Sequence, residues 1–138
     1  MFTWDEKYSV GIEVIDQQHK KLFAIGEEIH DKIIKDSCEE DECLVEALKV
    51  LEELKQYTVY HFTTEEELLK KYNYMELENH LIQHDLFINY LEDIDPKRLE
   101  KYPKEYLYEI MMYISKWIFK HISTVDFKYV DFLKINMI

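Results

Sequence analysis

Residues 51–69, LEELKQYTVYHFTTEEELL, decide the fold class of this chain. Leu51, Leu54, Thr58 and Phe62 recur there at intervals of three and four residues, with mostly charged or polar residues between them. This spacing places the four side chains on one face of an α-helix, which predicts a long amphipathic helix packed against a core.

Three further segments show the same spacing. The first contains Leu22, Phe23, Gly26, Ile29 and Ile33, the second Leu77, Leu81, Ile88 and Leu91, and the third Leu107, Ile110, Ile114, Trp117 and Ile118. Breaks are expected at a non-helical arm over about residues 1–15, near residues 38–42, at Asn73-Tyr74 and over residues 96–103. We therefore predict an all-α protein, a single domain over residues 1–138 built as an up-down-up-down four-helix bundle with a non-helical N-terminal arm.

Composition and charge argue against several classes of fold and of binding partner. The 138 residues include two Gly and two Pro, too few turn formers for a β-sandwich or barrel. Asp and Glu number 29 against 17 Lys and Arg, and the net charge of −12 argues against nucleic-acid and membrane partners. With no secretory signal and no long apolar run, we expect a cytoplasmic location. Cys38 and Cys43 are interpreted as free thiols at a helix connection, and their role stays open.

The apolar faces are interrupted almost only by histidine and carboxylate. The interrupting residues are His19, His61, Glu65, His80, His84 and His121. Residues four apart project from one helix face. The pair His61 and Glu65 can therefore bind one metal ion together, and so can the pair His80 and His84. Burying several such groups is costly unless a metal or another partner satisfies them. The pattern therefore favours a buried metal site.

The turn positions predict that these groups share one height in the bundle. Folding about residue 40 brings His19 level with His61, and folding about residue 73 brings Glu65 between His80 and His84. A turn near residue 100 places His121 within one helical turn of that level. His30 also lies on the inner stripe of the first helix. It is about 16.5 Å from His19 along the helix axis, so we expect a bundle-end or partly exposed histidine that either pairs with Glu27 or hydrogen-bonds to the backbone.

Asp126 differs from the rest of the set, because it follows His121 by five residues. In a regular helix that spacing separates the two directions by about 140°. The intervening Ile122-Ser123-Thr124-Val125 are weak helix formers, which predicts an irregular backbone that turns Asp126 inward. The alternative, in which Asp126 caps a short terminal helix, stays open on the residues alone.

The order of these residues resembles that of the hemerythrin family, in its bacterial single-domain form. The matching segments are Trp4 to Gly11, Ile15-Asp16-Gln17-Gln18-His19, His61-Phe62-Thr63-Thr64-Glu65-Glu66, His80-Leu81-Ile82-Gln83-His84, and Trp117-Ile118-Phe119-Lys120-His121 through Asp126-Phe127. The likeness covers essentially the whole chain, and no ligand position departs from the family pattern.

The resemblance implies a non-heme di-iron centre that binds dioxygen reversibly. His80, His84 and His121 would bind one iron, His19 and His61 the other, and Glu65, Asp126 and an oxo or hydroxo group would bridge them. Dioxygen would bind at the open position of the two-histidine iron. By family position the dioxygen pocket would be lined by Leu22, Phe62, Trp117, Ile118 and Ile122, which an ordinary bundle core would also contain.

Other chemistries on such a bundle fit the sequence less well. A ferritin-like oxidase needs Glu-x-x-His on two helices, and the only Glu-x-x-His here is Glu27 with His30. A catalytic zinc site needs about three ligands and a general base, and no His-Glu-x-x-His motif is present. We therefore expect a dioxygen carrier and not an enzyme, with a di-iron oxygen or redox sensor, or a peroxide-reducing or oxidase enzyme, as the alternative. The sequence does not identify an oxygen-consuming enzyme that would act as its partner.

Overall fold

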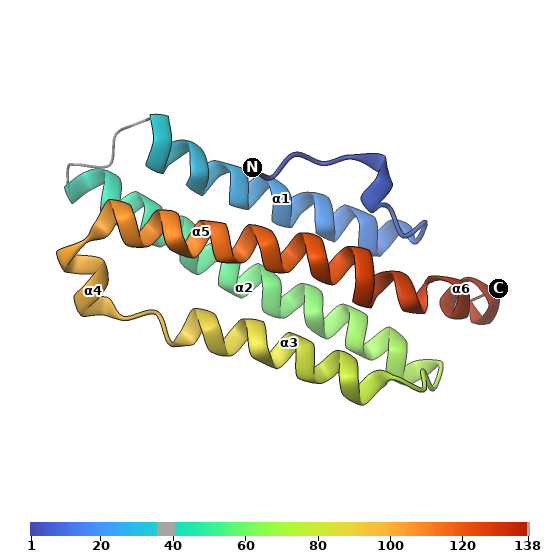
Figure 1. Cartoon of the computed structure of the whole chain (residues 1–138). Helices are drawn as coiled ribbons and strands as arrows, with labels where there is room; N and C mark the ends of the chain where they lie inside the picture. The colour runs from blue at the N-terminus through green and yellow to red at the C-terminus, as the bar shows by residue number, and fades with distance from the viewer. Residues whose placement is uncertain (36–40, 138) are drawn as a thin grey trace.

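The computed structural model describes residues 1–35 and 41–137 of the chain. Its long helices are α1 (Glu13–Lys35), α2 (Asp41–Lys71), α3 (Leu77–Glu92) and α5 (Pro103–Lys120), and the described residues form no strand. Figure 1 shows these helices side by side, each running opposite to the long helix before it. The predicted all-α class is confirmed. Cys38 lies outside the described residues, and the side chain of Cys43 is not described either.

The N-terminal arm is shorter than predicted and partly helical. A short 3-10 helix, η1, covers Glu6–Tyr8, and α1 begins at Glu13 instead of after residue 15. Asp16 accounts for the early start, because its carboxylate accepts hydrogen bonds from the Val10 N–H at 2.8 Å and the Ser9 hydroxyl at 2.5 Å. These bonds fix the arm just before the first turn of α1.

The connection over residues 96–103 also differs from the predicted break. It contains a short helix, α4 (Pro96–Lys101), whose first turn is capped by Asp95 through the Lys97 N–H at 3.0 Å. Proline lacks only an N–H that is unpaired in the first turn of any helix, so Pro96 and Pro103 begin helices here.

The turn predicted at Asn73 is present, with a φ of 58° in the left-handed region that Asn tolerates.

The inner stripe of α3 was predicted wrongly in part. Leu77, Leu81 and Ile88 are half-buried, and the buried residues of this helix are His80, His84, Phe87 and Leu91. These four follow each other at spacings of four, three and four, which is the spacing of one helix face. The histidines themselves therefore define the inner face of α3.

The helix that follows α5 changes type at the segment predicted to be irregular. A π-helix, η2, covers His121–Asp126, and α6 continues over Phe127–Asn136. The Phe127 N–H bonds to the Ile122 carbonyl five residues back, so the turn is wider than in an α-helix. The wider turn brings Asp126 round to the side of His121 and buries it fully. The predicted irregular backbone is confirmed, and Asp126 makes no side-chain capping bond to α6.

Candidate metal centre

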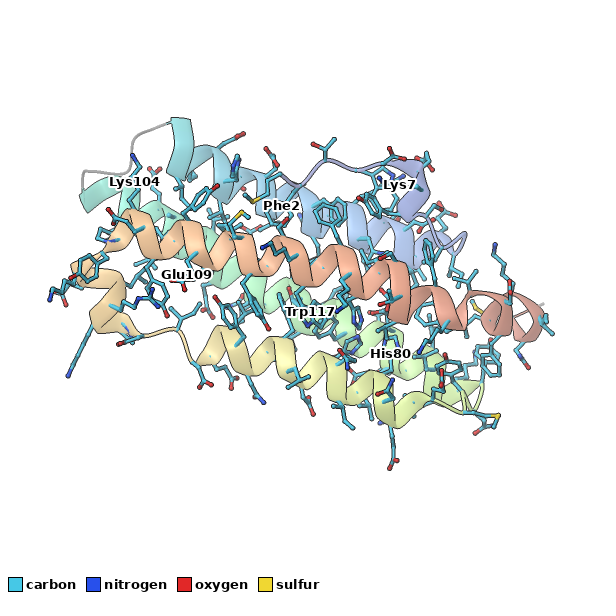
Figure 2. All side chains as sticks on the ribbon, viewed as in Figure 1. Phe2, Lys7, His80, Lys104, Glu109 and Trp117 are labelled. Carbon is cyan, nitrogen blue, oxygen red and sulfur yellow. The ribbon has the colours of Figure 1, made fainter. Side chains whose placement is uncertain are left out.

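The structure brings together all seven side chains predicted to bind metal. They are His19 of α1, His61 and Glu65 of α2, His80 and His84 of α3, and His121 and Asp126 of η2. Each has at most 5% of its surface exposed. Figure 2 labels His80 and also Trp117 of α5, and both lie between the α3 and α5 ribbons in that view.

The two carboxylate oxygens of Asp126 face histidines from different helices. Its Oδ1 lies 3.1 Å from Nε2 of His121 and 3.3 Å from Nε2 of His80. Its Oδ2 lies 3.3 Å from Nε2 of His19 on the other side of the cluster. Asp126 therefore spans the cluster from α3 and η2 to α1.

Glu65 makes a second connection across the cluster. Its Oε1 lies 3.0 Å from Nε2 of His61 and 3.5 Å from Nε2 of His84. Its Oε2 accepts a hydrogen bond of 2.5 Å from the hydroxyl of Tyr129, a fully buried residue of α6. Burial, together with the nearby charges of Glu65 and Asp126, raises the pKa of Tyr129 well above its usual value. Tyr129 therefore stays protonated and donates to Glu65.

The predicted heights agree with the observed ring contacts. The ring centroids of His19 and His61 are 4.6 Å apart, which joins α1 to α2 at one level. Those of His80 and His121 are 5.3 Å apart, and those of His84 and His121 are 5.1 Å apart. The four elements therefore deliver their polar groups to one layer.

The carboxyl groups of this layer are ionised despite their burial. Burial raises the pKa of Asp126, but the charge and close contact of His121 hold that pKa well below its usual range. The pKa of Glu65 is also lowered, because His61 and His84 outweigh burial and the charge of Asp126. Burial lowers the pKa of His61, whereas contacts with two carboxylates outweigh burial and raise the pKa of His84 to about 9. The layer presents two carboxylate anions to any cation within it.

Most of the atoms that face the middle of the layer lack a hydrogen-bond partner among the described residues. They are Nε2 of His19, His80, His84 and His121, Oε1 of Glu65 and both carboxylate oxygens of Asp126. Leaving one buried polar group unpaired costs about 1–3 kcal/mol. Cations bound within the layer would satisfy these atoms.

The donor atoms form two overlapping sets, in each of which they lie within 4.8 Å of one another. One set is Glu65, His80, His84, His121 and Asp126, and the other is His19, His61 and Glu65. Imidazole nitrogen and carboxylate oxygen together suit first-row transition metals. Because Glu65 belongs to both sets and Asp126 reaches His19, the residues present fit two metal ions that share carboxylates.

His30 lies apart from this layer, as predicted. Its side chain is 21% exposed, and its Nδ1 lies 3.6 Å from Oε1 of Glu27 on the same helix. Glu27 is already engaged, because its Oε2 accepts a 2.7 Å hydrogen bond from the Phe2 N–H and lies 3.4 Å from the N-terminal amine. His30 therefore belongs to the contact between the arm and α1.

A small cavity adjoins the layer on its apolar side. Its volume is about 10 Å³, which is room for one small molecule. Its lining includes all five residues predicted for a dioxygen pocket, Leu22, Phe62, Trp117, Ile118 and Ile122. Phe62 also stacks on the ring of His84 with centroids 3.7 Å apart, and Trp117 stacks on His121 at 4.3 Å. The aromatic walls thus also hold two of the predicted ligands in place.

Sequence reasoning missed several residues of the site. Thr58 and Phe87 line the cavity, Tyr129 bonds to Glu65, and Gln18 and Glu66 bond to outer nitrogens of the histidines. Gln18 directly precedes the predicted ligand His19, and Glu66 directly follows the predicted ligand Glu65. This proximity in the sequence was a usable signal. Tyr129 had none, because its role depends on where α6 lies after the π-turn.

An all-α bundle with a buried layer of histidines and carboxylates has the donor atoms that a cation-binding protein needs. Comparison with known proteins agrees: residues 10–133 match the profile of the hemerythrin HHE cation binding domain. The chain belongs to the hemerythrin family.

Curated relatives match over most of their length. The chain is 31% identical to a bacteriohemerythrin of Clostridium acetobutylicum, over 95% of this chain and 100% of the relative. It is 31% identical to a bacteriohemerythrin of Pseudomonas aeruginosa (strain PAO1), over 98% of this chain and 83% of the relative. It is also 31% identical to a myohemerythrin of Theromyzon tessulatum, over 93% and 90%. No solved structure matches the chain.

In the described part of the chain, no helix has the length and apolarity that crossing a bilayer requires.

Proposed function

We propose that this chain binds dioxygen reversibly at a pair of iron ions and acts as a binding protein, not an enzyme. Three findings support the proposal: membership of the hemerythrin family, two overlapping sets of donor atoms, and an apolar cavity beside them. A cytoplasmic location stays a prediction from the sequence, as does the absence of nucleic-acid and membrane partners.

The proposed ligands divide unequally between the two metal positions. His80, His84 and His121 would hold one ion, His19 and His61 would hold the other, and Glu65 and Asp126 would be shared. The observed contacts of Asp126 favour this division, because Oδ1 lies near His80 and His121 while Oδ2 lies near His19.

The position of the cavity is the observation that carries the proposal. Both histidines of the two-histidine position, His19 and His61, line the cavity, whereas of the other three only His121 does. A small molecule in the cavity would therefore meet the position that has fewer protein ligands. A catalytic site for larger substrates would need more room than this.

When bound as a ferrous pair, the metal supplies the two electrons that dioxygen takes up on binding and returns on release. The protein's part is to keep water and free protons out of the cavity. Its walls are mainly apolar, and the one hydroxyl among them, that of Thr58, donates to the Leu54 carbonyl at 2.7 Å. That proton is engaged in the helix and is not presented to the cavity. Such a dry environment favours release of dioxygen over further reaction.

Anaerobic loading with Fe²⁺ followed by exposure to dioxygen tests this function. We expect two irons per chain and a visible absorption band that appears with dioxygen and disappears when dioxygen is removed under argon. An irreversible diferric product, or turnover of added peroxide, would identify an oxidase or peroxide-reducing enzyme instead. Storage, delivery and scavenging of dioxygen would all use the same binding event.

A further inference from the structure

Two of the five histidines in the layer have an outer side-chain partner in the structure, and the two partners differ in charge. Nδ1 of His84 lies 2.9 Å from Oε2 of Glu66, and Nδ1 of His61 lies 2.7 Å from Oε1 of Gln18. In both cases Nε2 of the same ring points to Oε1 of Glu65. Each ring therefore joins an outer partner on one side to the centre on the other.

The hydrogen bonds around Gln18 determine which end of its amide faces His61. The Thr64 hydroxyl donates to the Tyr60 carbonyl at 3.1 Å, so its oxygen is free to accept. The amide nitrogen of Gln18 donates to that oxygen at 3.3 Å, which leaves the amide oxygen for His61. His61 consequently carries a proton on Nδ1, and Nε2 is the nitrogen that would bind a metal in the centre.

Glu66 imposes the same proton position on His84 but adds a full negative charge. A carboxylate can only accept, so Nδ1 of His84 donates to Glu66, and Nε2 is the nitrogen that would bind a metal in the centre. The Glu66 side chain is 26% exposed, so water screens its charge in part, whereas Gln18 is buried and neutral. A carboxylate behind a ligating histidine makes that histidine a stronger donor than an amide does.

Resting on the function proposed above, we infer that Glu66 and Gln18 are positioning residues that give the two metal positions unequal donor strength. Glu66, acting through His84, makes the three-histidine position richer in electrons. Gln18, acting through His61, orients the ligand of the two-histidine position without adding charge. The position beside the cavity is thereby kept the weaker donor of the two.

Two charge-changing variants with matched neighbours test this inference. Glu66→Gln removes the anion behind His84, and Gln18→Glu adds one behind His61. Glu67→Gln and Gln17→Glu make the same charge changes one residue away, at exposed positions of the same helices. Each protein is loaded with iron for a midpoint potential, titrated metal-free with Co²⁺, and melted to check folding.

We expect the midpoint potential to rise in Glu66→Gln and to fall in Gln18→Glu, with the two controls close to the wild type. The Co²⁺ affinity of Glu66→Gln should fall about 10- to 100-fold, the usual effect of losing an outer partner of a ligand. A purely structural role would lower the melting temperature without moving the potentials in opposite directions. Equal potentials in Glu66→Gln and Glu67→Gln would overturn the inference. A wild type that fails to hold two irons would instead overturn the proposed function.

Discussion

Asp126 shows how single residues make this layer possible. A fully buried carboxylate is expensive to desolvate, and pairing is what makes it tolerable in a protein interior. Three histidines lie within 3.3 Å of its two oxygens, and they keep it ionised. The charge that a metal ion needs is therefore already in place within the folded chain.

His19 and His30 offer the sharpest residue-scale prediction, because both are on α1 and only one reaches the layer. His19→Ala should lose the iron of the two-histidine position, since a buried ligand is removed. His30→Gln should keep both irons, because the carboxylates that His30 contacts, Glu27 and Asp31, do not belong to the layer. Iron content per chain, measured after anaerobic loading, checks both variants. The opposite pattern would show that the ligand of α1 is assigned wrongly.

Ile118 carries a second prediction at this scale. It is buried and lines the cavity, so Ile118→Thr should place a hydroxyl there and admit water. We expect the dioxygen-loaded protein to convert faster to the oxidised form. The rate is measured from the decay of its visible absorption band. Ile29→Thr is the matched control, because Ile29 is also buried, on α1, but does not line the cavity. Each change should cost about 1–3 kcal/mol of stability for burying a hydroxyl. Equal decay in both variants would count against a role of Ile118 in the pocket.

At the scale of elements, η2 decides whether the last helix can contribute two ligands. The Ser123 hydroxyl donates to the Phe119 carbonyl at 2.8 Å and the Thr124 hydroxyl donates to the Lys120 carbonyl at 2.6 Å. In an α-helix the backbone N–H groups of residues 123 and 124 would take those carbonyls. Ser and Thr side chains that bond to a carbonyl four residues back tend to bend a helix, so we infer that this adjacent pair helps to hold the wider turn that aims Asp126 at the layer.

The double variant Ser123→Ala/Thr124→Ala should weaken metal binding while leaving the bundle helical. Alanine is the best α-helix former, so the segment should shift toward an α-helix and rotate Asp126 by up to about 100°. We expect Co²⁺ affinity to fall about tenfold, comparable to the net value of one hydrogen bond. Thr63→Ala is the control, because its hydroxyl makes the same type of bond to Val59 inside the regular helix α2. Unchanged affinity in the double variant would show that the backbone holds the π-turn without these hydroxyls.

On the scale of the whole molecule, the polar layer separates two hydrophobic clusters. Leu22, Phe62 and Ile118 belong to the larger cluster, and Ile15 and Leu69 belong to the smaller one. Helices α1, α2 and α3 contribute residues to both clusters, whereas α5 contributes to the larger cluster and ends beside the layer. A metal bound in the layer would therefore tie both halves of the bundle together.

Metal binding should accordingly stabilise the entire fold. A ligand that binds only the folded state adds about 2.7 kcal/mol to the free energy of unfolding when its concentration is 100 times its Kd. We expect Co²⁺ to raise the thermal midpoint of the wild type, and a chelator to reverse the effect. Glu65→Ala, which removes the carboxylate common to both donor sets, should lose most of the increase. An equal increase in both proteins would mean that the metal binds elsewhere.

The sequence by itself determined the helical class, the heights of the histidines and the irregular segment before Asp126. These depend on local spacing, because three- and four-residue intervals fix which face of a helix a side chain occupies. Only the tertiary structure decided that Glu66 reaches His84, that Gln18 reaches His61 and that Tyr129 reaches Glu65. Each of these contacts joins two different helices. Spacing along one chain segment cannot predict them, because they depend on how the helices rotate and pack against one another.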